Sequence, residues 1–363
     1  MSTELQSHPR IRLMYWPNEP AHLKGEFSQV GGRLGFEQLA ADGTIDALEI
    51  YSYRQVRAEH ASASSFETDA RAAIDRFDPD ILFVQHLFGT DVSEGFWQRL
   101  RAERPGTTLI YHEGDPYDRF AKRIDATTQA VLRHADLVLA CGLGSLADIL
   151  HEVGHRPVEL KPHSFPQSRF ASIEPGSVEK TCDVVMIGNS GRRRRLKFLY
   201  VPGGRRRARF AARMSEAFEQ RFALYGAGWS HLVSSRGKLP FFEQERAIHS
   251  ARFTANWDHF DKIAYYFSDR LPISLAAGIP HVTSYHPGYE HYLRDVPGLY
   301  ACRTVDEAVD TCRWLSGRPD RALVEEGMAG REWVFRNLES NVVHRQAYEQ
   351  SLRAHRARLA APA

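Results

Sequence analysis

The chain has 363 residues, of which 43% are hydrophobic and 25% are charged, and its formal net charge at pH 7 is +2. This composition is that of a folded globular protein and excludes a disordered or fibrous chain, while the length exceeds one ordinary core and predicts two domains. No stretch approaches the roughly 18 uninterrupted apolar residues of a membrane-spanning helix. The polar start MSTELQSHPR has no apolar core, so we expect no secretory signal and a cytoplasmic protein.

The four cysteines are consistent with that location. Cys141, Cys182, Cys302 and Cys312 lack the paired spacing of a zinc site. We expect them to be reduced and mostly buried.

Strand-like and helix-like segments alternate through the first half of the chain. Apolar runs at 11–16, 46–53, 81–86, 107–113 and 136–141 predict strands, and the segments between most of them predict helices. Such a βαβ series predicts a doubly wound, parallel sheet.

The second half repeats this pattern after a connection at 158–170 that is rich in proline, serine and aromatic residues. Strand-like segments resume at 182–188, 221–228, 252–257 and 281–285, and helices close the chain. We therefore expect an α/β fold of two Rossmann-like doubly wound domains that face each other across a cleft. The predicted divisions are residues 1–170, residues 171–340, and a C-terminal helix at 341–363 that packs back toward the first domain.

The stretch ACGLGSLADIL at 140–150 fits the G-x-G-x-x-A dinucleotide fingerprint at Gly142, Gly144 and Ala147. That fingerprint belongs to the first strand of its unit, whereas this stretch follows about the fifth strand of its domain. A tight strand-to-helix turn with Ser145 as N-cap is the favoured interpretation.

Asp78 and Asp80 in FDPDIL resemble an Asp-x-Asp metal clamp for a nucleotide diphosphate. These carboxylates precede their strand, whereas ligands of open α/β sheets bind beyond the carboxyl ends of strands. A proline-containing turn is favoured, and we predict neither a metal site nor a cofactor.

The stretch IYHEGDPYDRF at 110–120 places His112, Glu113 and Asp115 just past the carboxyl end of a central strand. Polar groups meet ligands at that edge. A capped loop whose carboxylates satisfy backbone donors is the alternative, but the density of titratable groups favours a functional site.

Residues 186–214 combine a glycine-containing loop, Gly188 to Gly191, with arginine clusters at 192–195 and 205–209. A solvated basic helix face, a phosphate site and a nucleic-acid surface are the three interpretations of this charge. Because a helix turns about 100° per residue, the second cluster cannot all face one phosphate. We expect the first cluster to contribute to phosphate binding and most of the second to face solvent or another anionic partner.

The stretch YYFSDRLPISLAAGIPHVTSYHPGYEHYL at 265–293 predicts a short helix that stops at Gly278-Ile279-Pro280 before a strand. Asp269 and Arg270 lie at the electropositive N-terminus of that helix, where Arg270 can bind a diphosphate in bidentate fashion. The stretch resembles the nucleotide-sugar signature of the group 1 glycosyltransferases, which have the two-domain GT-B fold. It is most similar to the branch of spore-maturation-type glycosyltransferases.

Other segments carry the same resemblance. VVMIGNSGRRRR, LYGAGW, ARFTANW and PHSFPQSRF are similar to the strands, loops and linker of that branch, and His112 matches a histidine that faces the donor sugar in the wider family. The wider family also has two glutamates eight positions apart, where this chain has Tyr265 and Ile273. The usual carboxylate contact to the donor ribose is therefore absent from the pattern.

The resemblance implies a metal-independent enzyme that moves a sugar from a nucleotide-sugar donor to an acceptor hydroxyl, with retention at the anomeric carbon. The second domain would bind the donor and the first domain the acceptor. Arg270 would stabilise charge on the leaving diphosphate, His112 would contact sugar hydroxyls, and Glu113 or Asp115 would orient the acceptor or act as a base. The donor-binding residues expected are Gly188, Asn189, Ser190, Gly191, Arg193, Arg194, Tyr225, Gly226, Asp269 and Ser274.

Two other classes of function stay open. The arginine clusters allow a glycosyltransferase that modifies nucleic acid, or a nucleic-acid-binding protein without catalysis. The fold alone allows a non-catalytic, two-lobed ligand-binding protein. A carbohydrate, lipid or small-molecule acceptor is favoured, because arginine-rich helices are more often solvated faces than duplex readers. The sugar, the nucleotide and the oligomeric state are left open.

Overall fold

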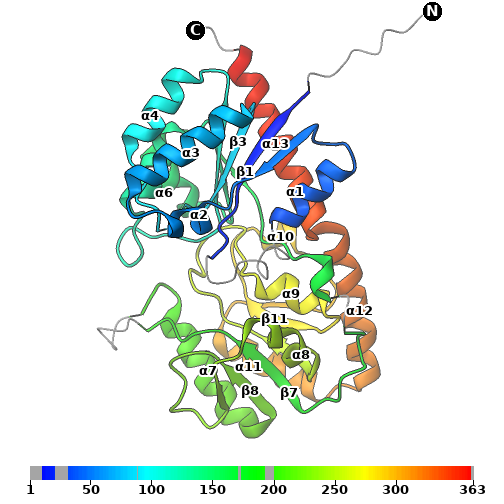
Figure 1. Ribbon diagram of the computed structural model, residues 1–363. Coiled ribbons are helices and arrows are strands. Elements are labelled where there is room, and N and C mark those ends of the chain that lie inside the picture. The colour runs from blue at the N-terminus through cyan, green and yellow to red at the C-terminus, as the bar shows by residue number, and fades with distance from the viewer. Residues whose placement is uncertain (1–9, 21–31, 88, 171–172, 193–199, 361–363) are drawn as a thin grey trace, which may run out of the picture.

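The computed structural model describes residues 10–20, 32–87, 89–170, 173–192 and 200–360. Two α/β halves lie one above the other, each built on a six-stranded sheet in which all pairs are parallel (Figure 1). The first sheet has the order β2-β1-β3-β4-β5-β6 and the second the order β12-β11-β10-β7-β8-β9.

Helices cover both faces of the first sheet. Its strands are β1 (Arg12–Trp16), β2 (Ala47–Ile50), β3 (Ile81–Gln85), β4 (Thr108–Glu113), β5 (Leu137–Ala140) and β6 (Val158–Leu160). Its helices are α1 (Gly32–Ala41), α2 (Tyr53–Glu59), α3 (Ala63–Phe77), α4 (Glu94–Glu103), α5 (Ala126–His134) and α6 (Ser145–Gly154). Buried side chains of α3 to α6 form one core with the sheet, and those of α1 form a second core on the opposite face.

The second sheet is sandwiched in the same way. Its strands are β7 (Cys182–Ile187), β8 (Phe222–Tyr225), β9 (Ser235–Gly237), β10 (Ala251–Ala255), β11 (His281–Ser284) and β12 (Leu299–Cys302). Its helices are α7 (Gly204–Phe218), α8 (Gln244–His249), α9 (Arg270–Ala276), α10 (Tyr289–Tyr292), α11 (Val305–Ser316) and α12 (Asp320–Asn337). Helices α7 and α11 pack on one face, and α8, α9 and α12 on the other.

The last helix, α13 (Ser340–Ala360), returns to the first half. Helices α12 and α13 run along one side of the molecule and connect the two halves (Figure 1). Ala347 and Tyr348 of α13 join the core beside α1. The approach of the two helices requires glycine in α1, since a Cβ at Gly35 would lie 2.7 Å from the ring of His344.

The expected fold class is confirmed, and so are the five strands predicted for the first half. Residues 158–160, expected in the connection, are instead the edge strand β6. Helix α2 and strands β9 and β12 were not expected. Within the part of the chain that the structure describes, no helix is long and apolar enough to cross a membrane.

The turn interpretation of Asp78 and Asp80 is confirmed. Asp78 is the left-handed C-cap of α3, with φ of 53°, and its carboxylate pairs with Arg104. Asp80 accepts a hydrogen bond from the backbone N–H of Arg12 at 2.8 Å. Both lie at the amino end of β3, away from the edge that binds ligands.

Candidate functional site

A pair of guanidinium groups lies at the carboxyl end of β7. Gly188 follows this strand, and a Cβ there would lie 1.9 Å from Nη2 of Arg207 and 3.1 Å from Nε of Arg270. Glycine at 188 therefore lets both arginine side chains reach the end of the strand, one from α7 and one from the first turn of α9.

Arg207 is buried, with 2% of its surface exposed, and its Nε and Nη2 have no hydrogen-bond partner among the described residues. Burial, reinforced by the neighbouring charge of Arg270, lowers its pKa to about 9. A buried cation without a hydrogen-bond partner is unfavourable unless an anion completes it. This geometry is that of an anion site formed before its ligand arrives.

Arg270 is more accessible and is held by its own half. Its Nε donates to the carbonyl of Ile187, and its Nη1 lies 3.3 Å from Asp269. Behind both arginines lies Asp258, which is buried and receives a hydrogen bond from Asn256. Burial raises the pKa of Asp258, but His286, Ser268 and Arg270 outweigh this and the pKa is lowered. An ionised Asp258 thus offsets part of the positive charge from behind.

The loop from Gly188 to Gly191 offers fewer free backbone amides for binding an anion than expected. The N–H of Gly188 donates to Tyr225 and the N–H of Ser190 donates to Ala227. The Asn189 side chain also accepts from the N–H of Ala227, at 2.8 Å. Two of the four loop amides are therefore engaged within the fold, and the guanidinium groups carry most of the anion site.

The remaining residues expected at the donor surround this point. Tyr225 ends β8, and a Cβ at Gly226 would lie 2.3 Å from the carbonyl of Gly188. Ser274 and Asp269 line a cavity of about 110 Å³ beside Arg270, together with Phe241 and Gln244. Arg193 and Arg194 lie outside the described residues.

At the end of β4, Glu113 has no exposed surface. Its carboxylate accepts hydrogen bonds from the hydroxyls of Tyr111 and Tyr117, from the N–H of Asp115, and contacts Nδ1 of His86 at 2.5 Å. Glu113 is thus placed to position His86 and the loop, and it is closed to a substrate. Asp115, whose side chain is 52% exposed and bonded to Lys122, is the accessible carboxylate of the expected pair.

His86 was missed by the sequence interpretation, which ended a strand at it. Its backbone is left-handed, with φ of 39°, and its N–H donates to the carbonyl of His112. Burial alone lowers the pKa of His86, but the Glu113 carboxylate outweighs it and the pKa is raised.

The side chains of His112 and Glu113 lie on opposite faces of the first sheet. His112 shares the face of Ile110, which is covered by α1 and α13. Burial, followed by the charge of Lys161, lowers the pKa of His112 well below its usual value. His163, in the connection after β6, has a pKa lowered by burial and lies edge-on to the ring of Tyr266 from the second half. Aspartates of both halves act on His163, namely Asp115 and Asp269.

The two halves meet directly beside this site. Leu143 donates its N–H to the carbonyl of Ala264 at 2.7 Å, and a Cβ at Gly142 would lie 2.6 Å from Ile263. The glycines of the apparent fingerprint thus allow close approach of the second half, and the stretch is a strand-to-helix turn as expected. The expected N-cap was wrong: Gly144 is the N-cap, and Ser145 is the first residue of α6.

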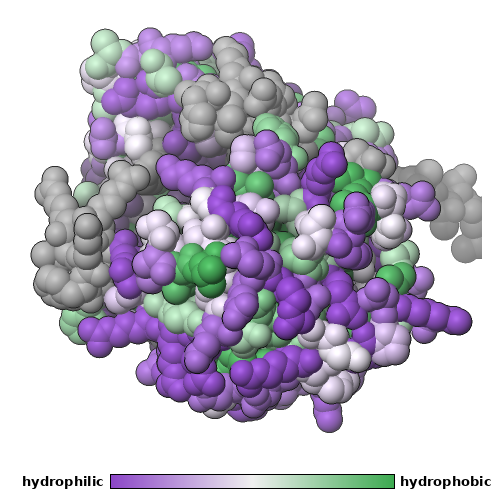
Figure 2. Space-filling model, turned by 90° about the horizontal axis from the view of Figure 1, so that it is seen from below, coloured by the Kyte–Doolittle hydropathy of each residue, from purple (hydrophilic) through white to green (hydrophobic). Residues whose placement is uncertain are grey.

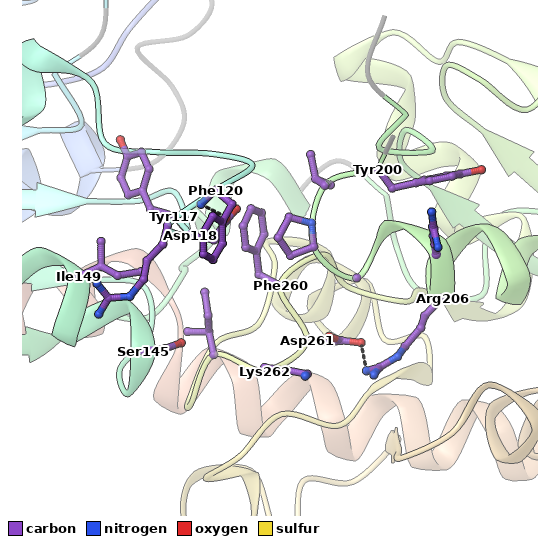
Figure 3. Close-up of a pocket in the computed structure, with 16 residues that line it drawn as sticks. Tyr117, Asp118, Phe120, Ser145, Ile149, Tyr200, Arg206, Phe260, Asp261 and Lys262 are labelled. Carbon is purple, nitrogen blue, oxygen red and sulfur yellow. Dashed lines mark hydrogen bonds and ion pairs between the residues drawn. The ribbon is translucent and has the colours of Figure 1, made fainter. Parts of the chain in front are cut away.

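A second cavity, of about 650 Å³, lies between the halves next to this contact. Figure 3 shows the rings of Phe120 and Phe260 close together in it, with the ion pair of Arg206 and Asp261 on one side. Phe120 is 84% exposed, which makes this an apolar surface open to solvent.

The arginines of the two clusters differ in their burial and in their partners. In the cluster at 205–209, Arg205, Arg206 and Arg209 are exposed and Arg207 is buried. Arg206 pairs with Asp261, and Arg209 and the half-buried Arg213 pair with Asp306. Arg192 donates to the hydroxyl of Tyr200. The end of the molecule formed by the second half is mostly hydrophilic in Figure 2, with apolar side chains in scattered groups.

The four cysteines are free and buried, as expected. Within the described ranges no group of three or more His, Cys, Asp or Glu side chains could hold a metal ion.

The architecture defines a class: two Rossmann-like halves joined by a returning C-terminal helix form the GT-B fold. Residues 205–357 match a family described as glycosyl transferase-like. No curated protein matches the chain in sequence.

Solved structures resemble the whole chain. A sucrose-phosphate synthase from Thermosynechococcus elongatus is similar with a TM-score of 0.60 and 12% identity, over 96% of this chain and 100% of that one. AviGT4, a glycosyltransferase of avilamycin A biosynthesis, has a TM-score of 0.56 and 15% identity, over 96% and 98% of the two chains. HepE of Anabaena, solved with UDP and glucose, has a TM-score of 0.54 and 9% identity, over 94% and 99%. At these identities the likeness establishes the GT-B fold.

Proposed function

We propose that the protein is a glycosyltransferase that takes a sugar from a nucleotide-sugar donor. The observation that carries the proposal is the buried guanidinium of Arg207 beside Arg270 at the carboxyl end of β7, whose Nε and Nη2 have no hydrogen-bond partner among the described residues. A diphosphate supplies two adjacent anionic groups, and guanidiniums bind such groups through charge-assisted hydrogen bonds. The match of residues 205–357 to a glycosyl transferase-like family and the GT-B fold support the same function.

The donor then spans two features of the second half. Its diphosphate lies between Arg207 and Arg270, and the base of its nucleoside enters the cavity lined by Phe241, Gln244 and Ser274. When the bond between sugar and phosphate breaks, negative charge grows on the departing diphosphate. Fixed cations at that position stabilise the transition state more than the ground state, which lowers the barrier.

On the first half, we propose that His112 contacts sugar hydroxyls as a neutral imidazole. Asp115 is the carboxylate proposed to orient the acceptor or accept its proton, since Glu113 is enclosed by its own hydrogen bonds. The acceptor would bind on the apolar surface formed by Tyr117, Phe120 and Phe260, which suits a sugar ring or a lipid chain. The pairing of Arg206, Arg209 and Arg213 with aspartates leaves the nucleic-acid alternative without added support.

Three finer parts of the proposal rest on the sequence. The resemblance of residues 265–293 favours retention at the anomeric carbon, which the configuration of the product measured by NMR tests. The same residues support membership of the spore-maturation-type branch. The free cysteines are those of a reducing, cytoplasmic environment.

A thermal-shift panel tests the donor site. Nucleoside diphosphates should raise the melting temperature where nucleosides do not, because a ligand at 100 times its Kd stabilises the native state by about 2.7 kcal/mol. If no nucleoside diphosphate or nucleotide-sugar at millimolar concentration shifts the melting temperature, the donor site is misassigned.

A further inference from the structure

A second buried cation lies on the opposite wall of the site, at the carboxyl edge of the first sheet. Lys161 directly follows β6, and only 4% of its surface is exposed. No hydrogen bond or ion pair joins its ammonium group to any residue that the structure describes. The site described above does not use this residue.

The position of Lys161 follows from strand register. Leu160 pairs with Ala140, which packs on the α3 to α6 face, and Glu159 points to the other face, where Gln350 of α13 donates to it at 2.9 Å. Since side chains alternate along a strand, Lys161 shares the face of Glu159. That is also the face of His112, so both side chains lie at one edge and on one side of the sheet.

The charge of Lys161 acts on three histidines. It is the second cause, after burial, that lowers the pKa of His112 and of His344, and it is one of the smaller causes that lower the pKa of His163. All three imidazoles are therefore neutral near pH 7 and can donate one hydrogen bond each. Burial lowers the pKa of Lys161 itself to about 7, and Cys141 is the group that opposes this.

The cluster contains nitrogen donors, and no acid among the described residues forms an ion pair with Lys161, although Asp115 and Asp269 act on His163. In the described part of the chain these histidines do not converge into a metal site. A buried lysine is normally paired, because the uncompensated charge is unfavourable. What would complete this cluster is an anionic group that enters with a ligand.

We propose that Lys161, with His112 and His163, forms a subsite for a carboxylate or phosphate carried by one of the two substrates. The inference rests on the proposed function, which supplies a sugar donor and an acceptor in the cleft. The charged group is separate from the donor diphosphate, which has Arg207 and Arg270 on the other wall. The group belongs either to the donor sugar, as in a uronic acid, or to the acceptor, as in a sugar phosphate.

Matched probes distinguish these two sources by isothermal titration calorimetry. The donor arm compares UDP-glucuronic acid with UDP-glucose, and the acceptor arm compares glucose 6-phosphate with glucose in the presence of UDP. In one arm the charged probe should bind at least about tenfold more tightly than its neutral partner, as expected for a charge-assisted contact in a buried site.

Lys161→Met should reduce that preference to about twofold or less and leave UDP binding unchanged, and Lys161→Arg should retain most of it. Lys238→Met is the matched control, because it removes an exposed lysine that lines neither cavity of the site and should leave the preference intact. An unchanged melting temperature or a higher one shows that Lys161→Met is folded, since the variant removes a buried charge with which no described residue pairs.

The pH dependence of the affinity for the charged probe is a second test of the role of Lys161. Lys161 is the group of this cluster that titrates between pH 7 and 9, since the pKa of Cys141 is raised and those of the histidines are lowered. Affinity for the charged probe should fall by up to about tenfold for each pH unit above 7 in the wild-type protein, and not in Lys161→Met.

Failure of the subsite and failure of the proposed function give different results. A protein that binds UDP but treats charged and neutral probes alike in both arms, or whose preference survives Lys161→Met, refutes the subsite and keeps the function. A protein that binds no nucleotide refutes the function. The subsite is then judged on glucose 6-phosphate against glucose alone, and equal binding refutes it too.

Discussion

Replacing Arg207 by methionine should have opposite effects on stability and on ligand binding. The fall in the pKa of Arg207 from its usual value to about 9 corresponds to an unfavourable interaction of about 5 kcal/mol between the buried cation and its surroundings. Methionine has a similar length and no charge, and it can pack beside Phe210 and Met214 of the same helix face. Imperfect packing offsets part of the gain, so we expect stabilisation of about 1–3 kcal/mol and a higher melting temperature.

The same substitution removes hydrogen bonds to the diphosphate. Each hydrogen bond to a charged group contributes about 1.5–3 kcal/mol, so the Kd for UDP should rise by about 10- to 100-fold. Melting curves and titration calorimetry with UDP measure the two effects on one protein sample.

Arg209→Met is the control for this experiment. Arg209 lies two residues after Arg207 in α7 but is exposed and paired with the exposed Asp306, and such surface pairs contribute about 0–1 kcal/mol. It should change neither quantity appreciably. If Arg207→Met binds UDP as tightly as the wild-type protein does, the guanidinium lies outside the donor site and the reasoning from its burial is wrong.

Four further predictions concern other parts of the site. Arg270→Ala should lower turnover by about 100-fold or more through lost stabilisation of the leaving group, and unchanged kinetics in a folded variant would remove Arg270 from the site. Incubation with EDTA should leave activity intact, whereas loss of turnover that Mg²⁺ or Mn²⁺ restores would contradict the assignment of the diphosphate to arginines. Gly142→Ala should destabilise the protein by about 1–3 kcal/mol in urea unfolding because its Cβ meets Ile263 and Tyr266, and Gly106→Ala, which meets nothing within 4 Å, should not. Between pH 7 and 10 the unfolded chain binds a proton at Lys161 that the folded chain has released. The free energy of unfolding of the wild-type protein, relative to that of Lys161→Met, should therefore rise by up to about 1.4 kcal/mol per pH unit. A difference that does not change with pH would mean that the pKa of Lys161 is not lowered.

Much of the fold could be predicted because the central strands are buried on both faces. ILFVQ of β3 and LVLA of β5 are nearly continuous apolar runs between helical segments. The strands that were missed lack this signal. SRG of β9 is a three-residue edge strand, and VEL of β6 adjoins a segment rich in proline and aromatic residues, so both look like connecting loop.

The candidate site was predictable only in part. Ligands of open α/β sheets bind beyond the carboxyl ends of the strands, and this rule led to His112, Asp115 and Gly188. The positions of these residues follow from the strands that precede them. Composition could not show which arginine of RRRAR turns inward. Helical phase could have done so, since Arg207 lies three, four and seven residues before the buried Phe210, Ala211 and Met214.

Other features needed three-dimensional structure. The enclosure of Glu113 depends on Tyr111, Tyr117 and His86, and the contact with His86 spans two strands. The close approach at Gly142 depends on a segment more than a hundred residues later in the chain. Neither local propensity nor residue spacing contains such information.

The most direct test of the central claim is ³¹P NMR of the purified protein incubated with nucleotide-sugars, since the account requires cleavage of the bond between sugar and diphosphate. With the donor it accepts, the wild-type protein should convert the two coupled diphosphate resonances of the nucleotide-sugar into those of the free nucleoside diphosphate, slowly by hydrolysis and faster with an acceptor. Arg207→Met and Arg270→Ala should each suppress this conversion. A wild-type protein that binds a nucleotide-sugar and leaves the panel of donors intact with every acceptor class offered would contradict the account and indicate a non-catalytic ligand-binding protein of GT-B fold.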